Sequence, residues 1–198
     1  MISSLTFIIV AQERVEISDS ILLSSIRIEL ENIRMKDQTF RQIKKCIEDK
    51  FGFESEETKY YWSLIHEQDS LNEKTVIKIL DSFGWLSQQQ IGYMANQSIW
   101  LVIQHAPIET QEKYLSLLKE SVEEGGSEGW YLAFLEDRIL MRTNKKQKYG
   151  SQLIQNKETG EYKLYQVEDP ENLNKRRAEI GLEPIEDYLK NYSNVKSD

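Results

Sequence analysis

Hydrophobic residues recur with a helical period over most of the first 142 positions of the chain. At about 100° per residue, Leu23, Ile26 and Leu30 share one face, which predicts a helix from about Ser20 to Lys50. Ser18 or Asp19 is the expected N-cap, and Gly52 the expected end. The same pattern predicts five more helices, at about 55–67, 70–82, 87–105, 109–124 and 128–142. The last of these has an alternative ending as a strand at 139–141.

The pattern changes after Asn144. Short alternating segments at 149–155 and 161–167, joined by Lys157-Glu158-Thr159-Gly160, predict a β-hairpin. Two short helices are expected after it, at about 169–180 and 185–192. The fold class is therefore mainly α. We expect a single-domain helical bundle over residues 19–192, with a small antiparallel hairpin near 149–167 and a polar tail at 193–198.

Residues 1–18 form a separate N-terminal segment, and their apolar run from Leu5 to Ala11 is too short to span a membrane. One interpretation is a first strand or an irregular start. The other is the remnant of a secretory signal, although the basic region that opens such signals is missing. The expected location is cytoplasmic under the first interpretation. It is the periplasm if residues 1–11 are a signal remnant.

The net charge of −8 argues against a general nucleic-acid binder, which needs a basic face to neutralise phosphates. A single cysteine, Cys46, excludes an internal disulfide and a cysteine-rich zinc site, and two histidines are too few for most histidine-based metal sites. We therefore expect no metal, no cofactor and no integral membrane segment. The expected partner is a small polar or anionic ligand, and the sequence identifies no protein partner.

Several ionisable residues lie on the apolar stripes of the predicted helices. Asp37 and Arg41 stand one turn apart, His105 ends its helix before Pro107, and Asp137 lies among aromatic and aliphatic positions. Buried charges are costly unless they are paired. Each group has two interpretations: a member of a polar site, or a structural ion pair or satisfied core residue.

The segment from Gln147 to Gln152, QKYGSQ, places amides, a phenol and a hydroxyl around Gly150. Glycine lets the main chain approach a ligand and present its N–H groups, but the same residues suit a turn before a strand. No phosphate-loop, nucleophile-elbow, dinucleotide or zinc-protease motif is present.

Five short motifs occur in order along the chain. They are Asp37-Gln38-Thr39-Phe40-Arg41, Gln104-His105-Ala106, Leu135-Glu136-Asp137-Arg138, the segment 147–152, and Arg176-Arg177-Ala178-Glu179-Ile180-Gly181-Leu182. This series, which covers roughly residues 37–188, resembles a bacterial family known only as a domain of unknown function. Ser151 stands where that family has threonine, and Leu86 where it has proline after Gly-Trp. The resemblance and the helical positions select the same residues, so we expect His105, Asp137, Arg138 and the segment 147–152 to share one pocket. The resemblance implies no activity.

Three functions are compatible with these residues, so whether the protein is an enzyme stays open. The first is a metal-independent hydrolase or transferase acting on a small anionic substrate, with His105 as general base or acid and Asp137 orienting it. The second is a non-catalytic binding protein for a small polar ligand or peptide. The third is a structural polar network in a protein that binds its partner elsewhere. Substrate-binding residues in the first two are Asp37, Gln38, Arg41, Gln104, Arg138, Gln147, Tyr149, Gln152, Arg176 and Arg177.

Overall fold

A computed structural model describes residues 4–156 and 161–192, and it describes side chains from residue 19 onward. The expected turn at 157–160 and the expected tail at 193–198 lie outside the described residues. The described chain is mainly α-helical with one two-stranded antiparallel hairpin, so the expected fold class is confirmed. Its elements are α1 (Ser4–Phe51), α2 (Glu56–Phe83), α3 (Gln88–Ile91), α4 (Tyr93–His105), α5 (Ile108–Glu123), α6 (Gly129–Arg142), β1 (Leu153–Gln155), β2 (Tyr162–Leu164), a 3₁₀ turn (Pro170–Asn172), α7 (Leu173–Glu179) and α8 (Ile185–Lys190).

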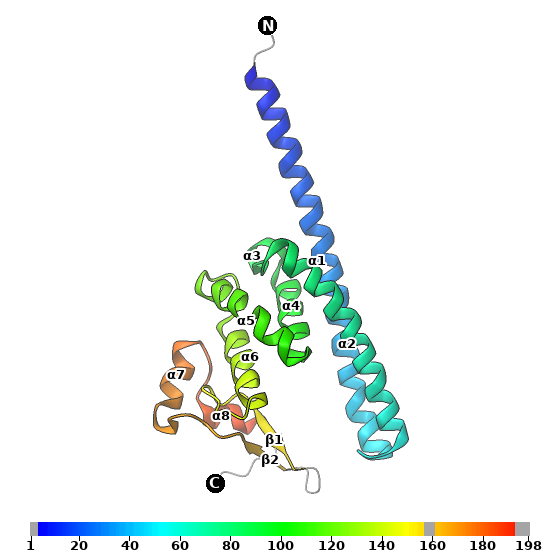
Figure 1. Ribbon diagram of the computed structural model, residues 1–198, viewed down its shortest axis with the longest axis vertical. Coiled ribbons are helices and arrows are strands. Elements are labelled where there is room, and N and C mark those ends of the chain that lie inside the picture. The colour runs from blue at the N-terminus through cyan, green and yellow to red at the C-terminus, as the bar shows by residue number, and fades with distance from the viewer. Residues whose placement is uncertain (1–3, 157–160, 193–198) are drawn as a thin grey trace. The chain divides into compact units, whose positions relative to one another are not determined.

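The chain forms two compact units, Met1–Val102 and Ile103–Asp198, which we call the N-terminal and C-terminal units. In the N-terminal unit α1 and α2 lie side by side and antiparallel, joined by a short connection after Gly52 (Figure 1). Their apolar faces meet in a core that α3 and the first turns of α4 extend. Its fully buried members include Leu30, Ile65, Val76, Leu80, Ile91, Ala95 and Ile99.

The C-terminal unit contains α5 and α6, which pack against each other, and the hairpin β1–β2 in the register Leu153↔Leu164. Helices α7 and α8 follow the hairpin (Figure 1). The buried side chains of this unit include Tyr114, Leu118, Tyr131, Leu135 and Leu173. Asp137 and Arg177 are also buried here, which places the polar segment 147–152 between α6 and α7.

Three expected boundaries were wrong. Helix α1 begins at Ser4 and not at Ser20, so an initial strand is excluded. The helices expected at 55–67 and 70–82 are one helix, α2, because residues 67–70 contain neither glycine nor proline and Ser70 Oγ bonds back to His66 O at 2.9 Å. The helix expected at 87–105 is divided at Gly92, whose φ is +84°. The helix expected at 128–142 is confirmed as α6, which ends at Arg142, so its alternative ending as a strand is wrong.

Two helices have a serine as their N-cap, as is common for helices that a serine precedes. Ser55 Oγ accepts a hydrogen bond from Thr58 N at 3.1 Å, and Ser87 forms a capping box with Gln90. Among the described residues, no helix combines the length and the apolar character needed to cross a bilayer.

Candidate functional site

The carboxylate of Asp137 is the centre of the polar network in the C-terminal unit. Asp137 is fully buried on α6 and accepts main-chain hydrogen bonds from Lys148 N at 2.7 Å and Ser151 N at 3.0 Å. Tyr149 N bonds to both carboxylate oxygens, at 3.1 and 3.2 Å. Burial raises the pKa of this carboxyl group, while the three N–H donors act in the opposite direction. The segment turns around Asp137 because Gly150 adopts a φ of +69°, which favours glycine.

Gln147 holds the two ends of the same segment, residues 147 and 152, together. Its side-chain Oε1 accepts from Gln152 N at 2.9 Å, and its Nε2 donates to Gln152 O at 3.1 Å and to Tyr165 O at 2.8 Å. Its main chain bonds to Gln166 O and accepts from Glu168 N, which adds a single parallel bridge beside the hairpin. All the polar groups of this buried glutamine are therefore occupied by main-chain atoms.

Arg176 and Arg177 on α7 bind the outer side of the segment. Arg176 Nε donates to Lys148 O at 2.9 Å, and its Nη2 donates to Glu168 O and Asp169 O. These bonds hold the segment and the chain before α7 together. Arg176, which was expected to contact a substrate, thus has main-chain carbonyls and the Asp169 carboxylate, 3.5 Å from its Nη1, as its partners.

Arg177 is fully buried, and the loss of hydration lowers the pKa of its guanidinium. Its Nη1 donates to Tyr149 O and its Nε to Glu183 O, both at 2.6 Å, and the group lies 5.1 Å from the ring centre of Tyr188. Within the described part of the chain, Nη2 has no hydrogen-bond acceptor.

Glu136, Lys148 and Tyr149 form the half-exposed edge of the network. Lys148 Nζ lies 2.5 Å from Glu136 Oε1. Burial and the nearby carboxylates of Glu136 and Asp137 raise the pKa of Tyr149 to about 12. The phenol therefore stays protonated near neutral pH and can donate but not accept a proton. Glu136 and Lys148 stand within motifs of the sequence, but neither was selected as a catalytic or substrate-binding residue.

Glutamine side chains converge on the main-chain carbonyl of Phe134. Gln104 Nε2 and Gln152 Nε2 each donate to it at 3.4 Å, and Gln111 Nε2 donates to Gln104 O at 2.8 Å. The Oε1 atoms of Gln104 and Gln111 are buried and have no donor among the described residues. Sequence reasoning missed Gln111, which occupies an apolar-face position of α5.

The structure does not join His105 to Asp137. His105 ends α4 and is partly exposed, and every hydrogen bond that Asp137 makes within the described residues goes to the segment 147–152. Arg138, the neighbour of Asp137 on α6, is also partly exposed. The structure therefore gathers Asp137, Gln147, Tyr149, Gln152, Arg176 and Arg177, and the catalytic dyad stays a prediction.

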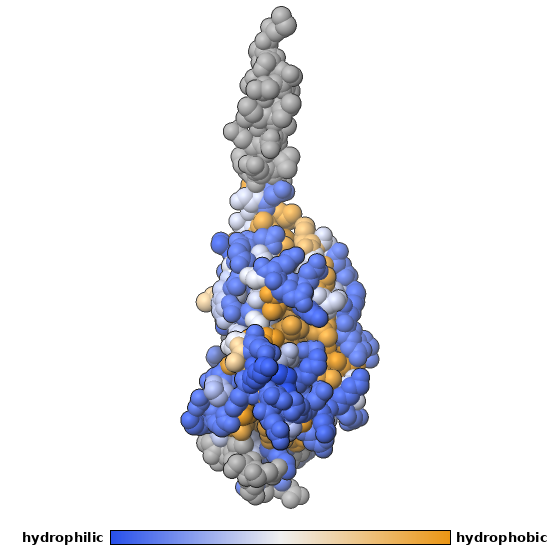
Figure 2. Space-filling model, turned by 90° about the vertical axis from the view of Figure 1, so that its left-hand side faces the viewer, coloured by the Kyte–Doolittle hydropathy of each residue, from blue (hydrophilic) through white to orange (hydrophobic). Residues whose placement is uncertain are grey.

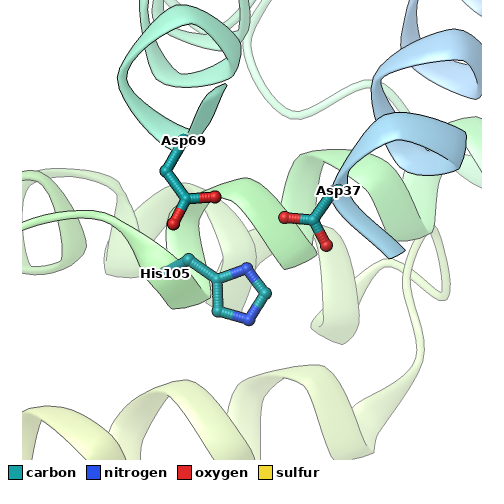
Figure 3. Close-up of side chains that lie close together, drawn as sticks. All are labelled: Asp37, Asp69 and His105. Carbon is teal, nitrogen blue, oxygen red and sulfur yellow. The ribbon is translucent and has the colours of Figure 1, made fainter. Parts of the chain in front are cut away.

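In the N-terminal unit, Arg41 joins two aspartates from adjacent helices. Its Nη1 lies 2.8 Å from Asp37 Oδ1 on α1, and its Nη2 lies 2.9 Å from Asp69 Oδ2 on α2. The two carboxylates face each other from the two helices (Figure 3). Gln38 Nε2 adds a bond to Asp37 Oδ2 at 2.7 Å. This ion-pair cluster links α1 to α2, and Asp69 was missed because a helix break was expected there.

A second candidate surface is an apolar stripe on the outer face of α1. Ile21, Ile28 and Met35 stand seven residues apart, and 66%, 55% and 60% of their surfaces are exposed. Hydrophobic surface is visible where the coloured part of α1 begins, below the grey atoms (Figure 2). Next to the stripe is a shallow groove of about 510 Å³ between α1 and α2, whose lining includes Ile28, Glu29, Asn32, Lys36, Leu71 and Asn72.

Comparison with known proteins identifies the family of the chain but no activity. Residues 25–196 match a family described as a family of unknown function, DUF6624, so the chain belongs to that family. No curated protein and no solved structure match it.

Proposed function

We propose that this family member is a non-catalytic protein-interaction module. Its partner binds the α1–α2 groove and the apolar stripe, and its buried polar network is structural. The main observation in support of this proposal is the seven-residue repeat of large, exposed apolar side chains at Ile21, Ile28 and Met35. Exposed apolar surface that follows one helix face is typical of helix-mediated association.

The hydrogen bonds of the C-terminal unit support a structural role for the polar network. Asp137, Gln147, Arg176 and Arg177 all bind main-chain atoms of the segment 147–152 or of the chain that flanks α7. Groups that bond to the main chain in this way fix the path of the chain, although Arg177 Nη2 has no acceptor within the described residues. A substrate would have to displace these main-chain bonds before it could use the same side chains.

The hydrolase or transferase hypothesis stays a prediction, with His105 and Asp137 as its catalytic residues. It lacks an evident nucleophile, and Tyr149 is protonated at neutral pH. A small-ligand site also stays a prediction, with Arg138 as a candidate contact. Thermal-shift screening of the wild type, His105→Ala and Asp137→Asn against small polar metabolites tests both alternatives. If both variants are as stable as the wild type and only the wild type shows a metabolite-induced shift, a purely structural role of the network is contradicted.

Site-specific photo-crosslinking tests the interaction surface directly. Ile28 or Met35 is replaced by p-benzoylphenylalanine, and cells that produce the protein are irradiated. We expect discrete adducts of higher mass at both positions. The control position is Glu56, whose side chain is 89% exposed but lies outside the groove, and it should give no adduct. No adduct at positions 28 and 35, or the same pattern at 56, would overturn the proposal.

A further inference from the structure

The exposed face of α1 has a regular pattern beyond its three largest apolar residues. Ser25, Asn32 and Thr39 are exposed and alternate with Ile21, Ile28 and Met35 at spacings of four and three residues. A repeat of 3.5 residues along one helix face is the pattern that packs against a second helix. The small polar side chains between the apolar ones allow close approach of that helix.

Two copies of this face of α1 can pair with each other when they run antiparallel and are related by a twofold axis at Asn32. Pairs of facing residues then have numbers that add up to about 64. Ile21 faces Ile43, and Ile28 lies within one residue of facing Met35, so large apolar residues meet at both ends and near the centre of the paired segment. Ile43 is 45% exposed, like the rest of the stripe. The paired segment from Ile21 to Ile43 is about 33 Å long, at about 1.5 Å per residue.

Charge complementarity selects the antiparallel direction. Glu29 and Lys36 flank the stripe, both are exposed, and neither has an ion-pair partner among the described residues. In the antiparallel pair, Glu29 of each copy lies within one residue of facing Lys36 of the other, which is within reach of these long side chains and gives two symmetric ion pairs. A parallel in-register pair would place Glu29 beside Glu29 and Lys36 beside Lys36, and like charges at an interface are unfavourable.

A buried polar atom in the groove is also unsatisfied in the single chain. Asn72 is 3% exposed and lines the groove, and its Oδ1 accepts from Gln68 Nε2 at 2.8 Å. Its Nδ2 has no acceptor within the described part of the chain. Buried donors without acceptors are rare in native structures, so an acceptor from an incoming chain would complete the site.

We propose that the protein forms a homodimer in which the exposed faces of two α1 helices pair antiparallel about Asn32. This inference rests on the proposed function and names its partner as a second copy of the chain. Leu71, which is 53% exposed on α2, extends the apolar contact beside the α1 pair.

Disulfide cross-linking tests the axis. In a Cys46→Ser background, Asn32→Cys should form an intermolecular disulfide, because the two copies of position 32 face each other at the axis. Gln42→Cys should not, because its two copies would be separated by roughly 30 Å, far beyond the Cα separation of a disulfide. Cross-linking at both positions would indicate a parallel pair. Cross-linking at neither position would exclude a dimer through this face, and both results overturn the proposal.

Charge exchange tests the pairing in solution. Analytical ultracentrifugation should give a dimer dissociation constant about tenfold higher for Glu29→Lys than for the wild type. The double variant Glu29→Lys/Lys36→Glu should restore the wild-type value. Glu54→Lys is the matched control, since Glu54 is exposed outside the stripe and the change in net charge is the same. Circular dichroism melting confirms that every variant folds.

Failure of this inference and failure of the proposed function give different results. A monomeric wild type, or a double variant that stays as weak as Glu29→Lys, overturns the homodimer. If photo-crosslinking at Ile28 still gives adducts that do not have the mass of two copies, the interaction module stands and its partner is a different protein. If no adducts form and the wild type is monomeric, both proposals fail.

Discussion

At the scale of single residues, Asp137 shows how one carboxylate can organise a loop. Its two oxygens accept main-chain N–H groups from Lys148, Tyr149 and Ser151, which follow it by 11, 12 and 14 positions. A carboxylate can accept several such bonds, whereas an asparagine amide has one oxygen and two N–H donors of its own. In a variant with asparagine at this position, the amide N–H₂ group would face main-chain N–H groups of the buried segment, and neither group can accept a hydrogen bond.

Asp137→Asn is therefore expected to lower the free energy of unfolding by about 1–3 kcal/mol, which is the cost of an unsatisfied buried partner. Urea denaturation followed by circular dichroism measures this change. Glu136→Gln is the control, because its half-exposed ion pair with Lys148 should contribute less than about 1 kcal/mol. Equal stability of the Asp137→Asn variant and the wild type would show that the carboxylate does not organise the loop.

Tyr149 gives a pH dependence at the alkaline end. Its pKa is about 12 in the folded chain and 10.0 ordinarily, so between these values the unfolded state releases the phenolic proton first. The folded state then holds more protons, and the free energy of unfolding falls as the pH rises from 10 to 12.

Tyr149→Phe removes this contribution, so the variant should lose less stability than the wild type across the same range. The difference should be about 1 kcal/mol, since the side chain is only half-buried. Urea denaturation at successive pH values measures it, and parallel curves for the two proteins would contradict the raised pKa.

The sequence predicts some of these residue roles and not others. The spacing of Asp37 and Arg41 predicts their ion pair, because positions i and i+4 are neighbours on a helix. Asp137 stands out because a charge on an apolar stripe needs a partner. The identity of that partner does not follow from the sequence, since main-chain N–H groups converge only after the segment has turned at Gly150.

At the scale of elements, the first residue of α6 packs closely against the end of α7. A Cβ atom on Gly129, the first residue of α6, would lie 2.5 Å from Ile180 O and 2.9 Å from Ile180 Cγ1. The closest obstacle is a main-chain atom, which cannot rotate away.

Gly129→Ala is therefore expected to destabilise the protein by about 1–3 kcal/mol, even though alanine generally favours a helix. Comparing Gly129→Ala/Ile180→Ala with Ile180→Ala alone separates the two obstacles, because alanine at position 180 lacks Cγ1 and leaves the carbonyl in place. Thermal denaturation should show that most of the loss remains. Full recovery would mean that the side chain of Ile180 is the obstacle.

Element boundaries were predictable where the sequence contains a clear signal. Ser55 and Ser87 cap helix starts and Gly84 follows a helix end in the structure, and serine before a helix and glycine after one are signals that a sequence shows. The expected break near Ser70 was wrong, because a polar residue does not end a helix when its hydroxyl bonds to the preceding turn. Gly92 divides a helix that its periodicity presents as continuous, since α3 and α4 keep apolar residues on one side.

At the scale of the whole molecule, each compact unit has a buried core of its own. Leu30 is fully buried in the N-terminal unit and Leu135 in the C-terminal unit. Replacing a fully buried leucine by alanine removes packing contacts and leaves a cavity, at a cost of about 2–5 kcal/mol.

Hydrogen exchange measured by mass spectrometry should locate each loss. Leu30→Ala is expected to speed amide exchange mainly in α2, and Leu135→Ala mainly in α5 and α6. Equal acceleration in both units for either variant would show that the chain opens only as one cooperative body.

Both compact units are continuous in sequence, and this has a consequence for synthesis on the ribosome. All residues of the first unit, up to Val102, are polymerised before any residue of the second. The remaining residues take roughly 5–20 s to add at typical elongation rates. Helical structure built on local contacts forms within microseconds to milliseconds. The α1–α2 hairpin therefore has time to fold while the rest of the chain is still being translated, so its apolar stripe is already formed on the nascent chain.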